Sequence, residues 1–252
     1  MVDEQLRIAT ESGKQILGRI TGNESSDTIL IFSHGFGVKS DSRGMFNLLV
    51  ERYQERFLTV RFHYVVVDDI TQDIFAISYS EQVEKLLHVV SKVQKKYGKK
   101  KIILISHSQG CGVSCKYIVE QNAKLAKHIM LAPPPTKNVA ERTREKFGKR
   151  KGAVLNESGM SIYPRTDGSQ TVIPPNFWAE AEAMKPLELY KKASEMVPTV
   201  VVWGAQDTTI QQENFTEIKQ LKLKRLVELP NGHEFMEDKM QGVMKVLDEE
   251  LT

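Results

Sequence analysis

The serine at the centre of the pentapeptide Ser106–Gly110 is the leading candidate for a nucleophile in this chain of 252 residues. The pentapeptide reads Ser-His-Ser-Gln-Gly, follows the apolar run Ile102–Ile105 and opens a stretch with helical character. A sharp turn from a strand into a helix lifts a serine hydroxyl above the sheet and leaves backbone N–H groups free at the helix N-terminus. Such a turn needs small residues two positions before and after the serine, here Ser106 and Gly110. The pattern predicts Ser108 as a nucleophile; the alternative is a polar loop beside a buried strand.

The base that would activate this serine is predicted to be His233. A serine hydroxyl is a weak nucleophile at neutral pH, so it needs a base within hydrogen-bond reach and a third group that fixes the tautomer of that base. When the serine stands at a strand-to-helix turn, the acid and the histidine follow it in the chain. Of six histidines, only His128 and His233 come after Ser108. His128 begins an apolar run typical of a strand, whereas His233 lies in the turn-rich loop Leu229–Glu234, where catalytic groups concentrate.

The acid of the set is predicted to be Asp207, which follows the strand-like run Thr199–Trp203 after a short turn. Its carboxylate would accept a hydrogen bond from one ring nitrogen of His233 and leave the other nitrogen to take the serine proton. The alternative role for this aspartate is to cap a helix that starts near Ile210. Because one carboxylate has few lone pairs, the two roles are expected to compete. Asp167 is the reserve candidate, in a segment that we interpret as a cap.

A glycine-rich turn supplies a third element of the site. The run Thr28–Phe32 leads into Ser33–Gly37, which reads Ser-His-Gly-Phe-Gly. A tetrahedral intermediate carries an oxyanion that must be met by donors already in place. We expect the backbone N–H groups of Phe36 and Gln109 to be these donors. His34 is expected to be structural, with its ring hydrogen-bonded to nearby backbone.

Four motifs, in this order along the chain, resemble those of the α/β-hydrolase superfamily. They are His34–Gly37, Ser106–Gly110, Val202–Asp207 and Gly232-His233. The resemblance spans almost the whole chain, which looks most like the small bacterial carboxylesterases, including the cinnamoyl-esterase and monoacylglycerol-lipase-like groups. It implies the α/β-hydrolase fold, a Ser-His-Asp triad and no cofactor. Many relatives carry a Gly-x-Gly-x-Ser loop where this chain reads His63–Ile70, so the loop that faces the substrate is expected to differ.

The elements that would position these residues follow from the apolar pattern. Strand-like runs occur at Thr28–Phe32, Leu58–Phe62, Ile102–Ile105, Ile129–Leu131, Thr199–Trp203 and Arg225–Leu229. Helical patterns separate most of them, which favours an α/β fold with a mainly parallel sheet flanked by helices. Before them, Leu6–Ala9 and Gln15–Ile20 around Glu11–Lys14 predict an antiparallel hairpin. Apolar residues at helical spacing predict a helix that ends at Tyr97-Gly98 and a last helix with a stripe over Met236–Leu251.

The alternation stops between residues 133 and 196, where about sixty residues replace a short connection. We interpret 133–196 as an inserted cap and 1–132 with 197–252 as the core. Phe177 and Trp178 in this segment would either sort acyl groups or anchor the cap to the core. The segment lacks the long apolar face of a lid that opens onto lipid. A small soluble ester is therefore the expected substrate.

Composition limits the other classes. A net charge of +3 is too small to indicate a nucleic-acid partner. The basic segment Glu141–Lys151 indicates either a solvated helix face or a rim that favours acidic substrates. The chain has no apolar run near the roughly 20 residues that cross a bilayer and no N-terminal secretion signal, so we expect a cytoplasmic protein without stable membrane insertion. The two cysteines, Cys111 and Cys115, indicate core positions and are too few for a metal site.

Together these features predict a serine esterase that cleaves carboxylic esters of small soluble substrates through an acyl-enzyme, without cofactor or metal. A monoacylglycerol lipase and a thioesterase are alternatives on the same fold. The alternative from another class is a ligand-binding protein without activity. The presence of all three triad residue types favours an enzyme, because binding alone needs no such set. No feature of the sequence selects an oligomeric state.

Overall fold

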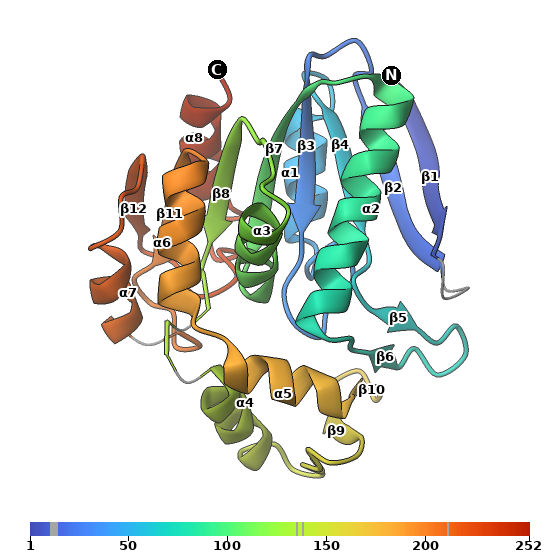
Figure 1. Cartoon of the computed structure of the whole chain (residues 1–252), viewed down its shortest axis with the longest axis vertical. Helices are drawn as coiled ribbons and strands as arrows, with labels where there is room; N and C mark the ends of the chain where they lie inside the picture. Colours follow the sequence, from blue (N-terminus) through green and yellow to red (C-terminus); the bar gives the residue numbers. More distant parts are fainter. Residues whose placement is uncertain (11–14, 135, 138, 211) are drawn as a thin grey trace.

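Eight strands form the central sheet of the protein (Figure 1). The structure is a computed structural model that describes residues 1–10, 15–134, 136, 137, 139–210 and 212–252. In spatial order the strands are β1 (Val2–Ala9), β2 (Gln15–Gly22), β4 (Leu58–Phe62), β3 (Thr28–Ser33), β7 (Lys101–His107), β8 (Lys127–Leu131), β11 (Thr199–Gly204) and β12 (Arg225–Leu229). β2 pairs antiparallel with β1 and β4, and the other neighbours are parallel. The predicted fold and hairpin are confirmed; the turn at 11–14 lies outside the described residues.

Helices cover both faces of this sheet. The helices of the structure are α1 (Met45–Tyr53), α2 (Tyr79–Tyr97), α3 (Gln109–Glu120), α4 (Val139–Gly148), α5 (Pro175–Ala183), α6 (Pro186–Met196), α7 (Gln212–Ile218) and α8 (Gln241–Glu250). α1 and α8 pack on one face, and α2, α3 and α6 pack on the other. Because both faces are covered, the central strands are apolar without alternation, as in β3, where Leu30 and Ile31 are both fully buried but face opposite sides.

The long helix α2 begins where the sequence provides a capping box. The Ser78 hydroxyl accepts a hydrogen bond from the Glu81 backbone N–H, and the Glu81 carboxylate accepts one from the Ser78 N–H. The helix ends at Tyr97, before Gly98, as predicted. Among the described residues, no helix combines the length and the apolar character that crossing a bilayer requires.

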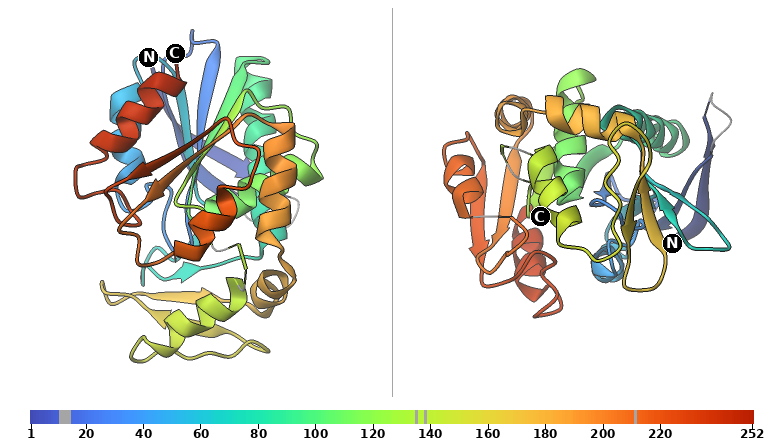
Figure 2. Two further views of the ribbon diagram at one scale, coloured as in Figure 1. Left: turned by 90° about the vertical axis from the view of Figure 1, so that its left-hand side faces the viewer. Right: turned by 90° about the horizontal axis from the view of Figure 1, so that it is seen from below.

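A second, smaller sheet lies at one end of the main sheet, together with α4 and α5 (Figures 1 and 2). Its strands, in spatial order, are β5 (Val66–Val67), β6 (Ile74–Phe75), β10 (Gln170–Ile173) and β9 (Ser161–Pro164). β5 and β6 come from the range predicted as core, and β9 and β10 come from the range predicted as cap. α6, at the end of that range, runs beside α3 (Figure 1). The division into 1–132, 133–196 and 197–252 stays a prediction.

The last helix is shorter than the sequence pattern predicts. α8 begins at Gln241, so Met236 and Met240 lie before it. The backbone is left-handed at Phe235, Lys239 and Met240, with φ between 52 and 65°. A left-handed residue interrupts the helical hydrogen-bond ladder, and residues 232–240 therefore form consecutive turns. These turns carry the loop that holds His233.

Candidate active site

Ser108 stands between β7 and α3 with φ 51° and ψ −125°, a backbone conformation that residues other than glycine rarely adopt. The Ser108 N–H donates to the Leu131 carbonyl at 3.0 Å, and the Ser108 carbonyl accepts from the Cys111 N–H at 2.9 Å. Both bonds hold the strained turn in place. Strain that the surrounding structure maintains is typical of functional positions. The structure thus places Ser108 on the strand-to-helix elbow that the sequence predicts.

The small residues of the elbow have separate structural reasons. At Gly110, an added Cβ would overlap the Ser33 carbonyl oxygen and lie 2.7 Å from that of His34. Ser106, where the usual motif has glycine, is fully buried, and its hydroxyl lies 2.7 Å from Ser114 Oγ and 2.9 Å from His128 Nε2. Burial lowers the pKa of His128 to about 3, so this histidine is neutral. Ser106 is tolerated because its hydroxyl has partners inside the protein.

Replacing Gly110 by alanine is expected to destabilise the fold by about 2 to 3 kcal/mol, because the new methyl group overlaps backbone that cannot rotate away. The matched control is Gly112→Ala on the same helix, where an added Cβ finds its nearest neighbours at 3.9 Å. That change is expected to be neutral or to stabilise by up to about 1 kcal/mol. Urea unfolding of both variants measures the difference; equal midpoints would contradict the close approach of α3 to β3.

The three residues predicted as a triad meet in series. Ser108 Oγ lies 3.0 Å from His233 Nε2, and His233 Nδ1 lies 2.7 Å from Asp207 Oδ2. The carboxyl side chain of Asp207 is fully buried, while the His233 side chain keeps 15% of its surface exposed. Because a carboxylate oxygen accepts and does not donate, Nδ1 carries the proton and Nε2 is free to accept from the serine hydroxyl. The arrangement suits proton transfer from serine to histidine.

Asp207 binds His233 and a stretch of backbone at the same time. Oδ2 accepts from His233, and Oδ1 accepts from the backbone N–H groups of Thr209 and Ile210 at 2.7 and 2.9 Å. No helix starts at Ile210, so Oδ1 binds a turn and does not cap a helix as the sequence analysis considered, and the two contacts do not compete because each uses a different carboxylate oxygen. The turn that Oδ1 binds precedes α7, which begins at Gln212. The two backbone bonds fix the carboxylate and so aim Oδ2 at the imidazole.

The expected oxyanion donors come from two loops that lie against each other. A Cβ added to Gly35 would lie 3.2 Å from the Ser108 Cβ, so the turn after β3 passes directly beside the elbow. Within the described part of the chain, the backbone N–H groups of Phe36 and Gln109 donate to no acceptor. Both are therefore free to bind a ligand oxygen. Their role as oxyanion donors stays a prediction.

His34 is structural, as expected. Its Nε2 accepts from the Tyr64 N–H at 2.9 Å, so Nδ1 carries the proton and donates to the Gly35 carbonyl at 2.9 Å. Burial lowers the pKa of His34 to about 3. A neutral ring with both nitrogens bound to backbone holds the turn but has no capacity left for catalysis.

Elements of the predicted cap support the turn that carries Phe36. The Phe36 ring packs on Phe177 of α5 at 5.3 Å between centroids, and the Arg165 guanidinium donates to the Gly37 carbonyl. Phe177 and Trp178 are each 2% exposed. Of the two roles considered for these aromatics, the structure favours anchoring. The sequence analysis missed Arg165, which follows β9 and bears no local signal of this contact.

The remaining candidates lie elsewhere. Asp167 accepts from the backbone and hydroxyl of Ser169 in the turn between β9 and β10, at 3.1 and 2.6 Å. Cys111 and Cys115 are fully buried, and burial raises the pKa of both thiols. Within the described ranges, no three histidine, cysteine or acidic side chains gather as metal ligands would.

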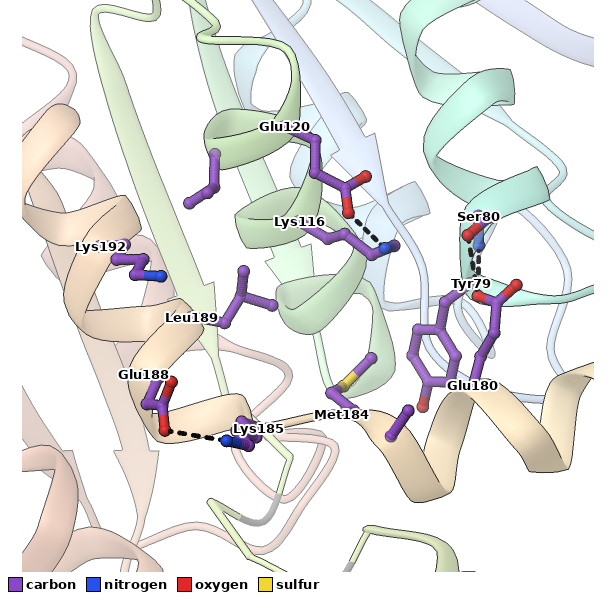
Figure 3. Close-up of a pocket in the computed structure, with 12 residues that line it drawn as sticks. Tyr79, Ser80, Lys116, Glu120, Glu180, Met184, Lys185, Glu188, Leu189 and Lys192 are labelled. Atoms are coloured by element: carbon purple, nitrogen blue, oxygen red, sulfur yellow. Dashed lines mark hydrogen bonds and ion pairs between the residues drawn. The ribbon is translucent and has the colours of Figure 1, made fainter.

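A cavity of about 370 Å³ opens between α2, α3 and the junction of α5 with α6 (Figure 3). Its wall alternates charges with apolar groups, including the pair Lys116–Glu120 on α3 and the apolar Leu189 of α6. Ser108, Asp207 and His233 are not among its lining residues. This hollow is therefore separate from the three residues that meet in series.

Comparisons with known proteins agree with this fold. A family described as "Alpha/beta hydrolase of unknown function (DUF900)" matches residues 9–163. Est1E from Butyrivibrio proteoclasticus is similar in structure, with a TM-score of 0.74, 19% identity, and coverage of 98% of this chain and 97% of that chain. The esterase domain of a Rhodothermus marinus protein has a TM-score of 0.71 and 14% identity, with coverage of 99% of this chain and 97% of that chain. The Pyrococcus furiosus esterase Pf2001 has a TM-score of 0.69 and 15% identity, with coverage of 98% of this chain and 89% of that chain. No curated protein matches the sequence significantly.

Proposed function

The chain belongs to the alpha/beta-hydrolase family of unknown function that matches it over residues 9–163, and we propose that it is a serine hydrolase of carboxylic esters. The observation that carries the proposal is the pair of hydrogen bonds from Ser108 Oγ through the His233 imidazole to Asp207, at 3.0 and 2.7 Å. The strained elbow at Ser108 and the free N–H groups beside it support the same reaction. The likeness of fold to three esterases is consistent with it.

In the proposed reaction, Ser108 Oγ attacks the ester carbonyl carbon while His233 Nε2 takes the hydroxyl proton. The carbonyl oxygen becomes an oxyanion, which the N–H groups of Phe36 and Gln109 stabilise. The bond to the alcohol oxygen then breaks, and His233 gives its proton to the departing alcohol. Water repeats the sequence: His233 takes a proton from it, its oxygen attacks the acyl carbon, and the acid leaves as Ser108 regains a proton. Asp207 orients the imidazole and stabilises its cationic form.

We propose a small soluble ester as the substrate. The structure of the neighbour Est1E has been solved with ferulic acid bound, and ferulic acid is a small aromatic carboxylic acid. In this chain Phe177 and Trp178 of α5 are buried against the core, so these aromatic side chains form no exposed apolar face for a lipid aggregate. A cytoplasmic location also stays a prediction.

The nearest alternative is a monoacylglycerol lipase, and a thioesterase shares the same chemistry. Each buried methylene contributes about 0.8 kcal/mol, so turnover that rises with acyl length beyond about eight carbons would favour the lipase. A ligand-binding protein without activity is the alternative of another class. It is disfavoured because binding does not need a serine hydroxyl within 3.0 Å of an imidazole nitrogen.

Labelling with a fluorophosphonate probe tests the proposal directly. The probe reacts with a serine oxygen that a neighbouring base activates, so we expect one covalent adduct that peptide mass spectrometry locates on Ser108. Heat-denatured protein is the control, because unfolding separates Ser108 from His233. A folded protein that stays unmodified would favour the ligand-binding alternative, and one that is modified at another serine would exclude Ser108 as the nucleophile.

A further inference from the structure

The residue before the proposed nucleophile connects two loops of the site. His107 ends β7 and is buried, with 5% of its surface exposed. Its Nε2 lies 3.0 Å from the backbone carbonyl oxygen of His233, and its Nδ1 lies 3.2 Å from Ser42 Oγ. A carbonyl oxygen can only accept, so Nε2 carries the proton and donates to His233. Nδ1 therefore accepts from the Ser42 hydroxyl, which gives a directed chain from Ser42 through His107 to His233.

The His107 ring is neutral. Burial is the main cause that lowers the pKa of His107 to about 3, and the nearby His233 acts in the same direction. Neither nitrogen is free to exchange protons with a substrate, because each has a fixed partner. The contribution of this residue to a reaction must therefore come from geometry.

The donor to His107 sits in a strained segment. Ser42, Arg43 and Gly44 have consecutive φ values of 48, 58 and 91°. Left-handed backbone is unfavourable at a residue other than glycine, and it persists where the surrounding contacts enforce it. Ser42 is 2% exposed and binds His107, while Arg43 forms an ion pair with Glu234. This segment thus contacts the loop of His233 in two ways. In the interior the contact runs from Ser42 through His107, and at the surface it is the ion pair of Arg43.

From this geometry we propose that His107 is a positioning residue for His233. The inference rests on the proposed function. Asp207 fixes the rotation of the His233 ring through Nδ1, and His107 fixes the backbone from which that ring projects. The two rings also pack with centroids 5.0 Å apart. Because His107 precedes Ser108 in the chain, it ties the base to the same strand end that holds the nucleophile.

Three variants at position 107 separate the two hydrogen bonds. His107→Gln places an amide N–H near the position of Nε2 and can still donate to the His233 carbonyl. His107→Asn is shorter and reaches only toward Ser42, and His107→Phe keeps a ring without either bond. We expect kcat to fall by about 100-fold in the asparagine and phenylalanine variants, since a displacement of about 1 Å costs that much. KM is expected to change little, and glutamine is expected to restore most of kcat.

A variant at a second position, Ser42, tests the same proposal even if His107→Phe fails to fold. Ser42→Ala removes the donor to Nδ1 and leaves the His107 bond to His233 in place, so we expect a loss in kcat of about fivefold. In the His107→Gln background the same change is expected to cost nothing further, because glutamine no longer contacts Ser42. Such non-additivity is the mark of residues that act in series. Additive losses would overturn the chain from Ser42 through His107.

Fluorophosphonate labelling of each preparation separates the two proposals. An active, labelled wild type with low kcat in His107→Asn and recovery of most of kcat in His107→Gln supports the positioning role. An active, labelled wild type whose asparagine and phenylalanine variants keep the full kcat would overturn the positioning role alone. A wild type that neither turns over esters nor reacts at Ser108 would overturn the proposed function and this inference with it.

Discussion

Replacing Ser108 by alanine is expected to lower kcat for a p-nitrophenyl ester by about 10⁵- to 10⁶-fold, as in serine enzymes that lose their nucleophile. The imidazole of His233, 3.0 Å from Oγ, then has no hydroxyl to deprotonate. The remaining rate would come from the N–H groups beside the elbow and from substrate binding. Stopped or continuous absorbance assays over a panel of short-chain esters measure the loss.

Two checks make this result specific. Alanine tolerates the backbone at φ 51° as poorly as serine does, so the thermal midpoint of Ser108→Ala should match that of the wild type. The control variant is Ser114→Ala, which removes the hydroxyl of a buried serine on α3. It is expected to cost about 1 kcal/mol of stability and to keep turnover near the wild-type rate. Activity in Ser108→Ala close to that of Ser114→Ala would exclude Ser108 as the nucleophile.

Burial on both faces leaves an unbroken apolar run in the sequence, so central strands of the main sheet could be predicted, and Ile102–Ile105 lies within β7. The predicted runs at Leu58–Phe62 and Arg225–Leu229, which also contain polar residues, match β4 and the partly buried edge strand β12. Strands β5 and β6 could not be predicted in the same way. Each has two residues, and β6 pairs with β10 about a hundred positions later, so no local periodicity marks them.

The last helix shows where periodicity misleads. Met236 and Met240 continue the apolar spacing of α8 toward the N-terminus, and Met240 is fully buried as a core residue would be. The backbone there is nevertheless left-handed at Lys239 and Met240. Apolar spacing indicates burial correctly at Met240 but not at Met236, which is 36% exposed. It also does not indicate that consecutive turns, rather than a helix, bury Met240.

The candidate site was predictable to the extent that each residue carried its own local signal. Ser108 stands between an apolar run and a helical stretch, and His233 stands in a turn-rich loop, so both could be named from the sequence. The link from Ser42 to His107 could not be named, because left-handed backbone at a serine leaves no mark in the sequence. That contact joins the segment after β3 to the end of β7, two neighbouring strands that are far apart in the sequence.

Replacing Asp207 by asparagine is expected to lower kcat by about 10⁴-fold while leaving the protein folded. The carboxylate uses Oδ1 for the N–H groups of Thr209 and Ile210, and Oδ2 for His233. Asparagine has one side-chain oxygen, which accepts the hydrogen bonds from the two backbone donors, so its NH₂ group faces His233 Nδ1. Nδ1 must then accept, the proton moves to Nε2, and the imidazole presents a donor where Ser108 needs an acceptor. Steady-state rates with the same ester panel measure the effect.

The matched control for this change is Asp167→Asn, which alters the other aspartate that the sequence offered as the acid. Asp167 binds Ser169 in a turn of the smaller sheet, and its loss is expected to leave kcat unchanged. A large loss in Asp167→Asn together with a small loss in Asp207→Asn would reverse the assignment. Thermal unfolding decides between a tautomer effect and a folding defect. Because the asparagine oxygen still caps the turn before α7, the two variants should unfold at similar temperatures, and the difference between them should appear in kcat alone.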